Sequence, residues 1–196
     1  MFNTIQDINK YAKNKNISLL NDDVIDYIRR RIKLFGLNKV LEIDEPLAYS
    51  IVNFASDNDD VKITDFELTR DNFMDNIKII KDFNLADNVT VFFTDLNSIS
   101  FNGKYNLILV NMINKNHLRL FDKLKDLLEE NGFIIITNVN YYNKLKKLKK
   151  ENDSKELDEY LINIEKIIKY FDESDEFLVD FIDASDGLIV AQKIIK

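Results

Sequence analysis

Short apolar segments with the character of buried strands alternate along this chain with segments whose apolar residues recur at helical spacing. Because parallel strands need long crossover connections, this alternation is typical of a parallel β-sheet covered by helices on both faces. A linker rich in proline or glycine is missing, since the 196 residues include only one proline and four glycines. The sequence therefore predicts a single α/β domain over residues 1–196.

The expected elements start with two helices, which form a lead-in over residues 1–36. The first carries Ile5, Ile8 and Tyr11 on one face, and the second follows a cap at Asn21 or Asp22. Further helices are expected from about Pro46, over 69–83, over 115–130 and around 157–171. Seven strands are expected at 39–43, 61–64, 89–93, 105–110, 132–137, 176–183 and 187–195.

The last two strands are joined by a short connection and should pair antiparallel. The predicted fold class is therefore a three-layer α/β/α, Rossmann-like domain. Its seven-stranded sheet is mostly parallel and ends in an antiparallel hairpin.

The composition narrows the functional class. The absence of cysteine excludes a disulfide framework and thiolate chemistry, and no apolar stretch approaches the roughly 20 residues that span a bilayer. The first residues lack the basic-then-apolar order of a signal peptide, which indicates a cytoplasmic protein without a membrane partner. A formal net charge of -7 argues against general affinity for nucleic acid, although a local basic patch could still bind RNA.

Polar residues fall at or just beyond the predicted carboxyl ends of four strands. They are Asp44, Asp65, Asp95 and Asn111. Ligands of open α/β sheets bind at this edge, so these side chains could converge on one cleft. The alternative is that acids simply favour strand ends and helix caps.

Three segments of the chain resemble class I S-adenosylmethionine (SAM)-dependent O-methyltransferases of the catechol and caffeoyl-CoA type. The resemblance is strongest to small bacterial members, which include tRNA 5-hydroxyuridine methyltransferases. Residues 14–43, ending in "VLEI", resemble the helical entry and the strand that ends in "LEIG" in that family. Residues 105–139 are similar to its "YDLIFIDADK" to "VDNV" region, and "DASDGLIVAQK" at 183–193 is similar to its closing hairpin.

The resemblance implies SAM as the cofactor and suggests which residues bind it. An acid after the second strand, placed at Asp65, would hydrogen-bond the ribose hydroxyls, and Asp95 would lie near the adenine. The cofactor positions carried over are Glu42, Asp44, Ser50, Asp65, Asp95 and Asn111.

The cofactor loop departs from the family pattern. In the stretch "EIDEPLAYS", Asp44, Pro46 and Ala48 occupy positions that are glycines in the family. Proline cannot reach positive φ, and other residues adopt it only at a cost of roughly 1–2 kcal/mol. Pro46 suits the first position of a helix capped by Asp44 or Glu45. The loop is therefore predicted to have reorganised into an ordinary capped helix start.

The metal site also departs from the family pattern. Asn111, Thr137 and Asn138 stand where the family places two aspartates and an asparagine. Mg²⁺ prefers carboxylate oxygens, so the divalent metal is predicted to be lost. No general base is assigned.

Three other polar features each allow a functional and a structural interpretation. His117 is a possible general base, but its place in the first turn of a helix favours packing or exposure. The lysine run 144–150 and Arg29–Arg31 could contact RNA phosphates or could be solvated helix faces. Tyr141 and Tyr142 could line the cleft or fill the space left by the metal.

Two functions remain open. The first is an O-methyltransferase with impaired or lost catalysis, acting on a hydroxyl of a small molecule or of a modified tRNA base. The alternative is a non-catalytic methyltransferase-like binding protein, a possible pseudoenzyme. The resemblance also implies a homodimer.

Overall fold

The computed structural model describes residues 1–56, 58–94, 103–111, 117–139, 155–183 and 187–195. Its strands form a seven-stranded sheet in the order β3-β2-β1-β4-β5-β7-β6. The strands are β1 (Lys39–Ile43), β2 (Lys62–Glu67), β3 (Val89–Phe93), β4 (Tyr105–Val110), β5 (Leu128–Ile136), β6 (Phe177–Ile182) and β7 (Leu188–Lys193). The sheet confirms the predicted Rossmann-like class.

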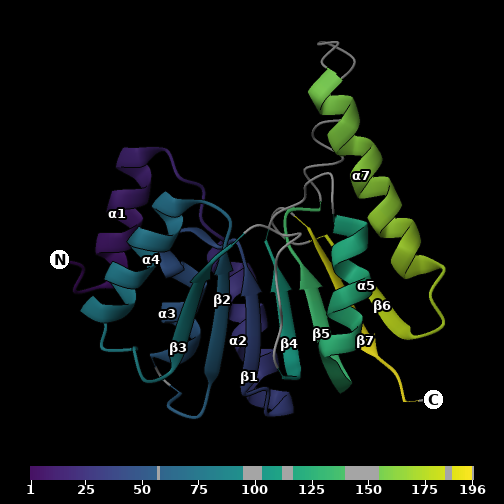
Figure 1. The fold of residues 1–196 in the computed structure, drawn as a ribbon, viewed down its shortest axis with the longest axis horizontal. Coiled ribbons are helices and arrows are strands. Elements are labelled where there is room, and N and C mark those ends of the chain that lie inside the picture. The colour runs from purple at the N-terminus through teal and green to yellow at the C-terminus, as the bar shows by residue number, and fades with distance from the viewer. Residues whose placement is uncertain (57, 95–102, 112–116, 140–154, 184–186, 196) are drawn as a thin grey trace. The chain divides into compact units, whose positions relative to one another are not determined.

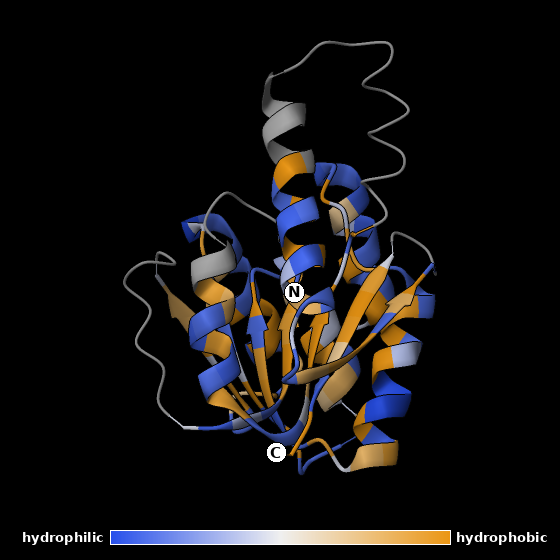
Figure 2. Cartoon of the chain, turned by 90° about the vertical axis from the view of Figure 1, so that its right-hand side faces the viewer, coloured by the Kyte–Doolittle hydropathy of each residue, from blue (hydrophilic) through white to orange (hydrophobic). Residues whose placement is uncertain are grey.

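The pairing within the sheet agrees with the predicted pattern. The β1–β2, β2–β3 and β4–β5 pairs are parallel, and β7 pairs antiparallel with both β5 and β6. Figure 2 shows that the strands are mainly apolar, as strands covered on both faces should be. Residues 184–186 of the predicted hairpin connection lie outside the described residues.

The chain divides into two compact units, Met1–Ser100 and Phe101–Lys196. Whether they act as one domain, as the sequence predicts, stays a prediction. Unit 1 contains β1 to β3 and the helices α1 to α4 (Figure 1). Its helical elements are α1 (Ile5–Lys15), α2 (Asp22–Phe35), the 3₁₀-helix η1 (Pro46–Ala48), α3 (Tyr49–Ala55) and α4 (Arg70–Asp82).

Local sequence signals explain where these helices begin and end. The Thr4 hydroxyl accepts from the backbone N–H of Asp7, and the Asp7 carboxylate accepts from that of Thr4, which makes a capping box before α1. Thr69 caps α4 in a similar way, with its hydroxyl 3.2 Å from the Asn72 nitrogen. Gly36 ends α2 in a left-handed conformation that glycine adopts readily.

Unit 2 contains β4 to β7, α5 (His117–Leu127) and α7 (Lys155–Asp172). Aromatic rings pack α5 and α7 against each other and against β6. The ring of Phe171 lies edge-on to those of Phe121 and Phe177, with centroids 5.3 Å and 5.5 Å away. Phe171 and Phe121 are fully buried, so this contact is the core of the helical layer in unit 2.

Two predicted boundaries are wrong. The helix expected to reach residue 130 ends at Leu127, because Leu128 is buried and pairs with Tyr105 of β4. The strand expected at 61–64 continues to Glu67, because Phe66 and Glu67 pair with β3. In both cases strand pairing, which is tertiary, overrides the local preference of acidic residues against strands.

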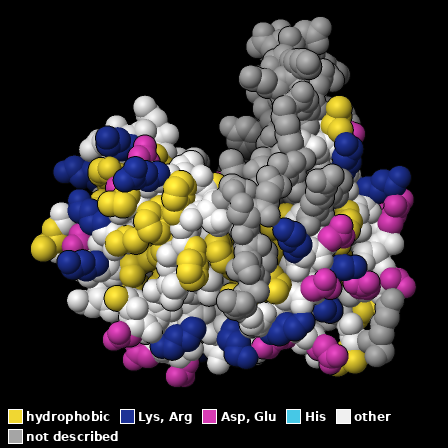
Figure 3. All heavy atoms as spheres, viewed as in Figure 1, with side chains coloured by type: hydrophobic (Ala, Val, Ile, Leu, Met, Phe, Trp, Pro, Cys, Tyr) yellow, Lys and Arg dark blue, Asp and Glu magenta, His cyan; other side chains and the backbone are white. Residues whose placement is uncertain are grey.

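The strand β3 lies at one edge of the sheet and exposes aromatic rings. About half of Phe92 and Phe93 is exposed, at 46% and 52%, and Met74 and Ile77 of α4 are also exposed. Figure 3 shows hydrophobic side chains gathered on the face that carries α4 and β3. Exposed apolar surface at a sheet edge is a common place of association, but the predicted homodimer stays a prediction.

We expect the substitution Phe171→Ala to lower the free energy of unfolding by about 3–5 kcal/mol, because it removes a buried ring that contacts two others. Urea denaturation followed by circular dichroism measures this change. Leu178→Ala in β6 is the matched control, because that side chain is 62% exposed and its loss should cost far less. Equal costs for the two substitutions would contradict this account of the core.

Candidate functional site

The loop after β1 keeps backbone angles that normally require glycine. Asp44, Leu47 and Ala48 have φ values of 60°, 62° and 44°. Asp44 and Ala48 stand at two of the three positions that are glycine in the resembled family. The prediction of an ordinary capped helix start is wrong, because neither η1 nor α3 has a side-chain cap hydrogen bond. The placement of Pro46 in the first turn of a helical segment is confirmed, and Glu45 occupies the N-cap position without a side-chain cap hydrogen bond.

Left-handed backbone at non-glycine residues costs roughly 1–2 kcal/mol for each residue. Leu47 and Ala48 are buried, and burial of their side chains offsets part of this cost. Strain of this kind persists only where the surroundings over-determine it, and it concentrates at functional sites. The loop is therefore the first candidate for a binding site.

The side chain of Asn76, on α4, holds the loop in place. Its Oδ1 accepts from the backbone N–H of Ala48 at 2.8 Å, and its Nδ2 lies 3.1 Å from the Glu45 carbonyl oxygen. The same Nδ2 lies 3.0 Å from Asp65 Oδ2 and 2.7 Å from Glu67 Oε1. One buried amide thus ties both ends of the turn to the end of β2.

Hydroxyl groups at the start of α3 make two further contacts. Ser50 Oγ donates to Glu42 Oε1 at 2.5 Å, so the structure brings together two predicted cofactor residues. Tyr49 donates its hydroxyl to Asp22 Oδ1 at 2.6 Å, which attaches α3 to α2. These contacts fix α3 directly behind the loop.

Acidic side chains gather where the loop meets β1 and β2. We call this group the carboxyl cluster; its members are Glu42, Asp44, Glu45, Asp65 and Glu67. Asp44 is 9% exposed and the other four are fully buried. Glu42 Oε2, Asp65 Oδ1 and Glu67 Oε2 have no hydrogen-bond partner in the described part of the chain. Buried oxygens without a partner are costly, so the cluster is suited to a ligand or to protons.

Burial raises the pKa of every carboxyl group in the cluster. It raises the pKa of Asp65 to about 7, with the hydrogen bond from Asn76 opposing the shift and the charge of Asp44 adding to it. Burial, with the charges of Asp65 and Asp44, raises the pKa of Glu67 to about 10. The pKa values of Glu42, Asp44 and Glu45 also lie above their usual range, chiefly through burial. At neutral pH the cluster therefore retains protons.

The structure corrects the place of Asp65. It lies inside β2, paired with Glu42 of β1, and the acid at the end of the strand is Glu67. Sequence reasoning missed Glu67, Glu45 and Asn76. The alternation Asp65-Phe66-Glu67 could have indicated two acids on one face of a strand, because side chains two residues apart point the same way.

Asp44 and Asn111 directly follow β1 and β4, as predicted. Asp95 lies outside the described residues, so the convergence of the four polar residues on one cleft stays a prediction. Lys115, Tyr141, Tyr142 and the lysine run 144–150 also lie outside them. His117 begins α5, as predicted, but its side chain is not among those described.

In unit 2, the residues at the predicted metal position bond to one another. Thr137 Oγ1 donates to Asn111 Oδ1 at 2.6 Å, and Asn138 Nδ2 lies 3.0 Å from the same oxygen. Asn138 has a φ of 63°, so its backbone is left-handed. This network is neutral, and it satisfies the Asn111 amide oxygen with donors instead of leaving it for a cation.

The donor set does not fit a hard divalent cation. Mg²⁺ requires several oxygen ligands, preferably carboxylates, whereas Asn138 presents an amide nitrogen to Asn111. Among the described residues, no three or more His, Cys, Asp or Glu side chains are arranged to hold a metal ion.

A cavity of about 470 Å³ lies in unit 1 between α2 and α3, lined by Arg29, Ile32, Lys33, Asn53, Phe54 and Asn58. The predicted arginine patch is divided here, because Arg29 faces the cavity and pairs with Asp26 at 3.8 Å. The guanidinium of Arg31 instead lies 4.8 Å from the centre of the Tyr27 ring. The RNA contact stays a prediction.

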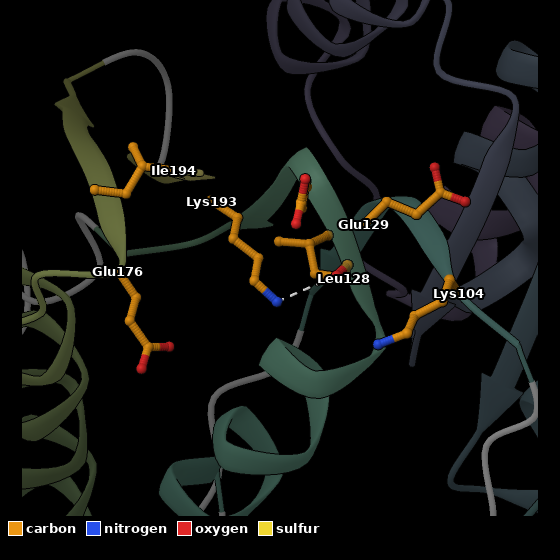
Figure 4. A pocket seen from close by; sticks show the side chains of 7 residues that line it. Lys104, Leu128, Glu129, Glu176, Lys193 and Ile194 are labelled. Carbon is orange, nitrogen blue, oxygen red and sulfur yellow. Dashed lines mark hydrogen bonds between the residues drawn. The ribbon is translucent and has the colours of Figure 1, made fainter. Parts of the chain in front are cut away.

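A cavity of about 690 Å³ lies in unit 2 where α5 meets β5 (Figure 4). It is lined by Lys104, Leu128, Glu129, Glu130, Glu176, Lys193 and Ile194. Lys193 Nζ donates to the carbonyl oxygens of Lys125 at 2.8 Å and Leu128 at 3.3 Å. Lys104 Nζ donates to that of Asp126. These ammonium groups cap the carboxyl end of α5, so a structural role accounts for them.

No helix in the described part of the chain has the length and apolar character needed to cross a membrane. No protein-family model matches the sequence, and no curated protein matches it either.

Solved structures do resemble the chain in fold. A proposed caffeoyl-CoA O-methyltransferase from Staphylococcus aureus matches with a TM-score of 0.88 and 18% identity, over 97% of this chain and 92% of that one. The SAH-bound methyltransferase PaMTH1 from Podospora anserina matches with a TM-score of 0.84 and 13% identity, over 100% and 89%.

An O-methyltransferase from Bacillus cereus in complex with SAH matches with a TM-score of 0.81 and 15% identity, over 98% of this chain and 91% of that one. At these identities the matches show a shared fold. One of the three is named as a caffeoyl-CoA O-methyltransferase, which is the type that the sequence resembles, and the other two as an O-methyltransferase and a methyltransferase.

We expect Ala48→Gly to raise the free energy of unfolding by about 1 kcal/mol, because glycine adopts the left-handed conformation of residue 48 without strain. Ala12→Gly is the matched control, because Ala12 is buried in the middle of the right-handed helix α1. There the same change should lower stability by about 1 kcal/mol. A loss of stability at both positions, measured by urea denaturation, would show that residue 48 is not strained.

We expect the stability of the native protein to fall as the pH rises from 5 to 9. The pKa of Asp65 in the folded protein, about 7, exceeds its ordinary value of 3.8. Its protonated form therefore stabilises the fold fully below pH 4, and that contribution is lost as the pH rises through 7. Glu67 extends the loss to higher pH, because its folded pKa of about 10 exceeds 4.5.

Asp65→Asn keeps a neutral side chain whose oxygen can still accept from Asn76. Urea denaturation at several pH values should give a flatter pH profile for this variant than for the native protein. Asp60→Asn, at an exposed position, should leave the profile unchanged. Identical profiles for the native protein and Asp65→Asn would contradict the assigned protonation.

Proposed function

We propose that this protein binds SAM at the loop after β1 and transfers its methyl group to a hydroxyl oxygen of a small molecule. The observation that carries the proposal is the left-handed backbone at Asp44, Leu47 and Ala48. Left-handed backbone at these non-glycine residues lowers the free energy of unfolding, and strain of this kind is concentrated at functional sites. The geometry is the one that lets a main chain approach a nucleotide-like ligand closely.

The carboxyl cluster supplies acceptors that suit this cofactor. Glu42, Asp65 and Glu67 each carry a buried oxygen that has no hydrogen-bond partner among the residues that the structure describes. SAM offers ribose hydroxyls and an ammonium group as donors. Ser50 orients Glu42 through its 2.5 Å hydrogen bond. When bound, SAM supplies an electrophilic methyl group on a sulfonium centre.

We propose that the reaction proceeds without a divalent metal. The neutral network of Asn111, Thr137 and Asn138 offers neither the charge nor the carboxylates that would lower the pKa of an acceptor hydroxyl. The favoured acceptors are therefore hydroxyls that are acidic by themselves, such as phenols or a hydroxylated tRNA base.

A non-catalytic role as a methyltransferase-like binding protein is the second candidate. It is favoured by the buried side chains of Leu47 and Ala48, which occupy the turn where the resembled family has no Cβ or a small one. In this case the ligand would bind and no methyl group would be transferred.

We expect titration calorimetry to give micromolar affinity for SAM, with the same value in the presence of Mg²⁺ or EDTA. Transfer of a labelled methyl group to a panel of phenols and to tRNA then separates the enzyme from the binding protein. Asn111→Ala should leave SAM affinity independent of Mg²⁺, as in the native protein.

The absence of binding at millimolar SAM, in protein whose circular dichroism spectrum is native, would reject the proposal. Binding that strengthens tenfold with Mg²⁺ would reject its metal-free form.

A further inference from the structure

The carboxyl cluster brings five acidic groups together in a buried site. The main influences on Glu42, Asp65 and Glu67 are burial, neighbouring carboxyls and the neutral side chains of Ser50, Asn72 and Asn76. Within the described part of the chain, lysine and arginine are not among these influences. A buried carboxylate without a cation is unfavourable, so these groups favour either protons or a positively charged ligand.

The groups around Asp65 come from every element packed against it. The strand β1 contributes Glu42, β3 contributes the apolar Val91, and α4 contributes the neutral Asn76. The remaining neighbours are Asp44 and Glu45 of the loop and Glu67 of β2 itself. These titratable neighbours are all acidic, so ionisation of any one of them increases the attraction for a cation and the repulsion between that group and the others.

We propose that the carboxyl cluster recognises the positive charge of the cofactor, so that the protein binds the sulfonium compound SAM more tightly than the product S-adenosylhomocysteine, whose thioether sulfur carries no charge. This inference rests on the proposed function and adds to it a preference between substrate and product. Three buried oxygens, on Glu42, Asp65 and Glu67, have no hydrogen-bond partner among the described residues and point to a ligand.

The preference follows from electrostatics in a buried site. SAM carries one more positive charge than the thioether, and a charge–charge interaction is much stronger in a protein interior than in water. Both ligands carry the same ammonium group, so binding of SAM should release more protons from the cluster than binding of the thioether does. The weaker hold on the product would assist its release after methyl transfer.

The test is titration calorimetry of the native protein with SAM and with S-adenosylhomocysteine at pH 6 and pH 8. Each titration is repeated in two buffers of different ionisation enthalpy, which gives the number of protons released. A group with a pKa of about 7, as for Asp65, is about one tenth ionised at pH 6 and about nine tenths ionised at pH 8. The ratio of SAM affinity to thioether affinity should therefore rise about tenfold over this range.

Asp65→Asn should abolish most of this rise, and Asp60→Asn, at an exposed position, should retain it. Because proton release is measured on the native protein, the test does not depend on the fold of a variant. Binding of both ligands with a ratio independent of pH, and with equal proton release, would overturn the charge preference and leave the proposed function standing. Failure of both ligands to bind would overturn both.

Discussion

The carboxamide of Asn76, on α4, forms hydrogen bonds with both the strained turn after β1 and the acidic end of β2. Its oxygen accepts from the backbone N–H of Ala48, and its nitrogen donates to one carboxyl oxygen each of Asp65 and Glu67. The strained turn and the acidic end of β2 are therefore stabilised by the same side chain. Loss of either hydrogen-bonding edge would leave buried polar atoms without partners, which costs more than an average hydrogen bond contributes.

The strained turn and the buried carboxyl groups lie at the same site. The left-handed backbone at Asp44, Leu47 and Ala48 lowers the stability of the fold, and so does the desolvation of the carboxyl cluster. Both costs are local, whereas the gain comes from the well-packed part of unit 1, where apolar side chains such as Ile8, Ile28 and Ile51 are fully buried. Natural proteins accept such local costs mainly where a ligand or a reaction requires them. The loop and the cluster are therefore more informative about function than the fold, which hosts many activities.

The departures from the family pattern have different physical meanings at the two sites. At the loop, Asp44 and Ala48 stand where the resembled family has glycines and adopt left-handed backbone angles, so glycine-type geometry is present without glycine. At Asn111, Thr137 and Asn138, neutral groups hydrogen-bond to one another where the resembled family has carboxylates, so this position offers no negative charge. Sequence comparison treats the two departures alike, and the structure distinguishes them.

The sequence by itself determined the fold class, because the alternation of apolar strands and amphipathic helices admits few other arrangements. It also placed Asp44 and Asn111 at strand ends and Thr69 at a helix start, since these depend on local signals. Only the tertiary structure decided that β2 reaches Glu67, that Glu45 is buried and that Asn76 faces both. These features depend on pairing with β3 and on packing of α4, which bring together residues distant in sequence and override local propensity.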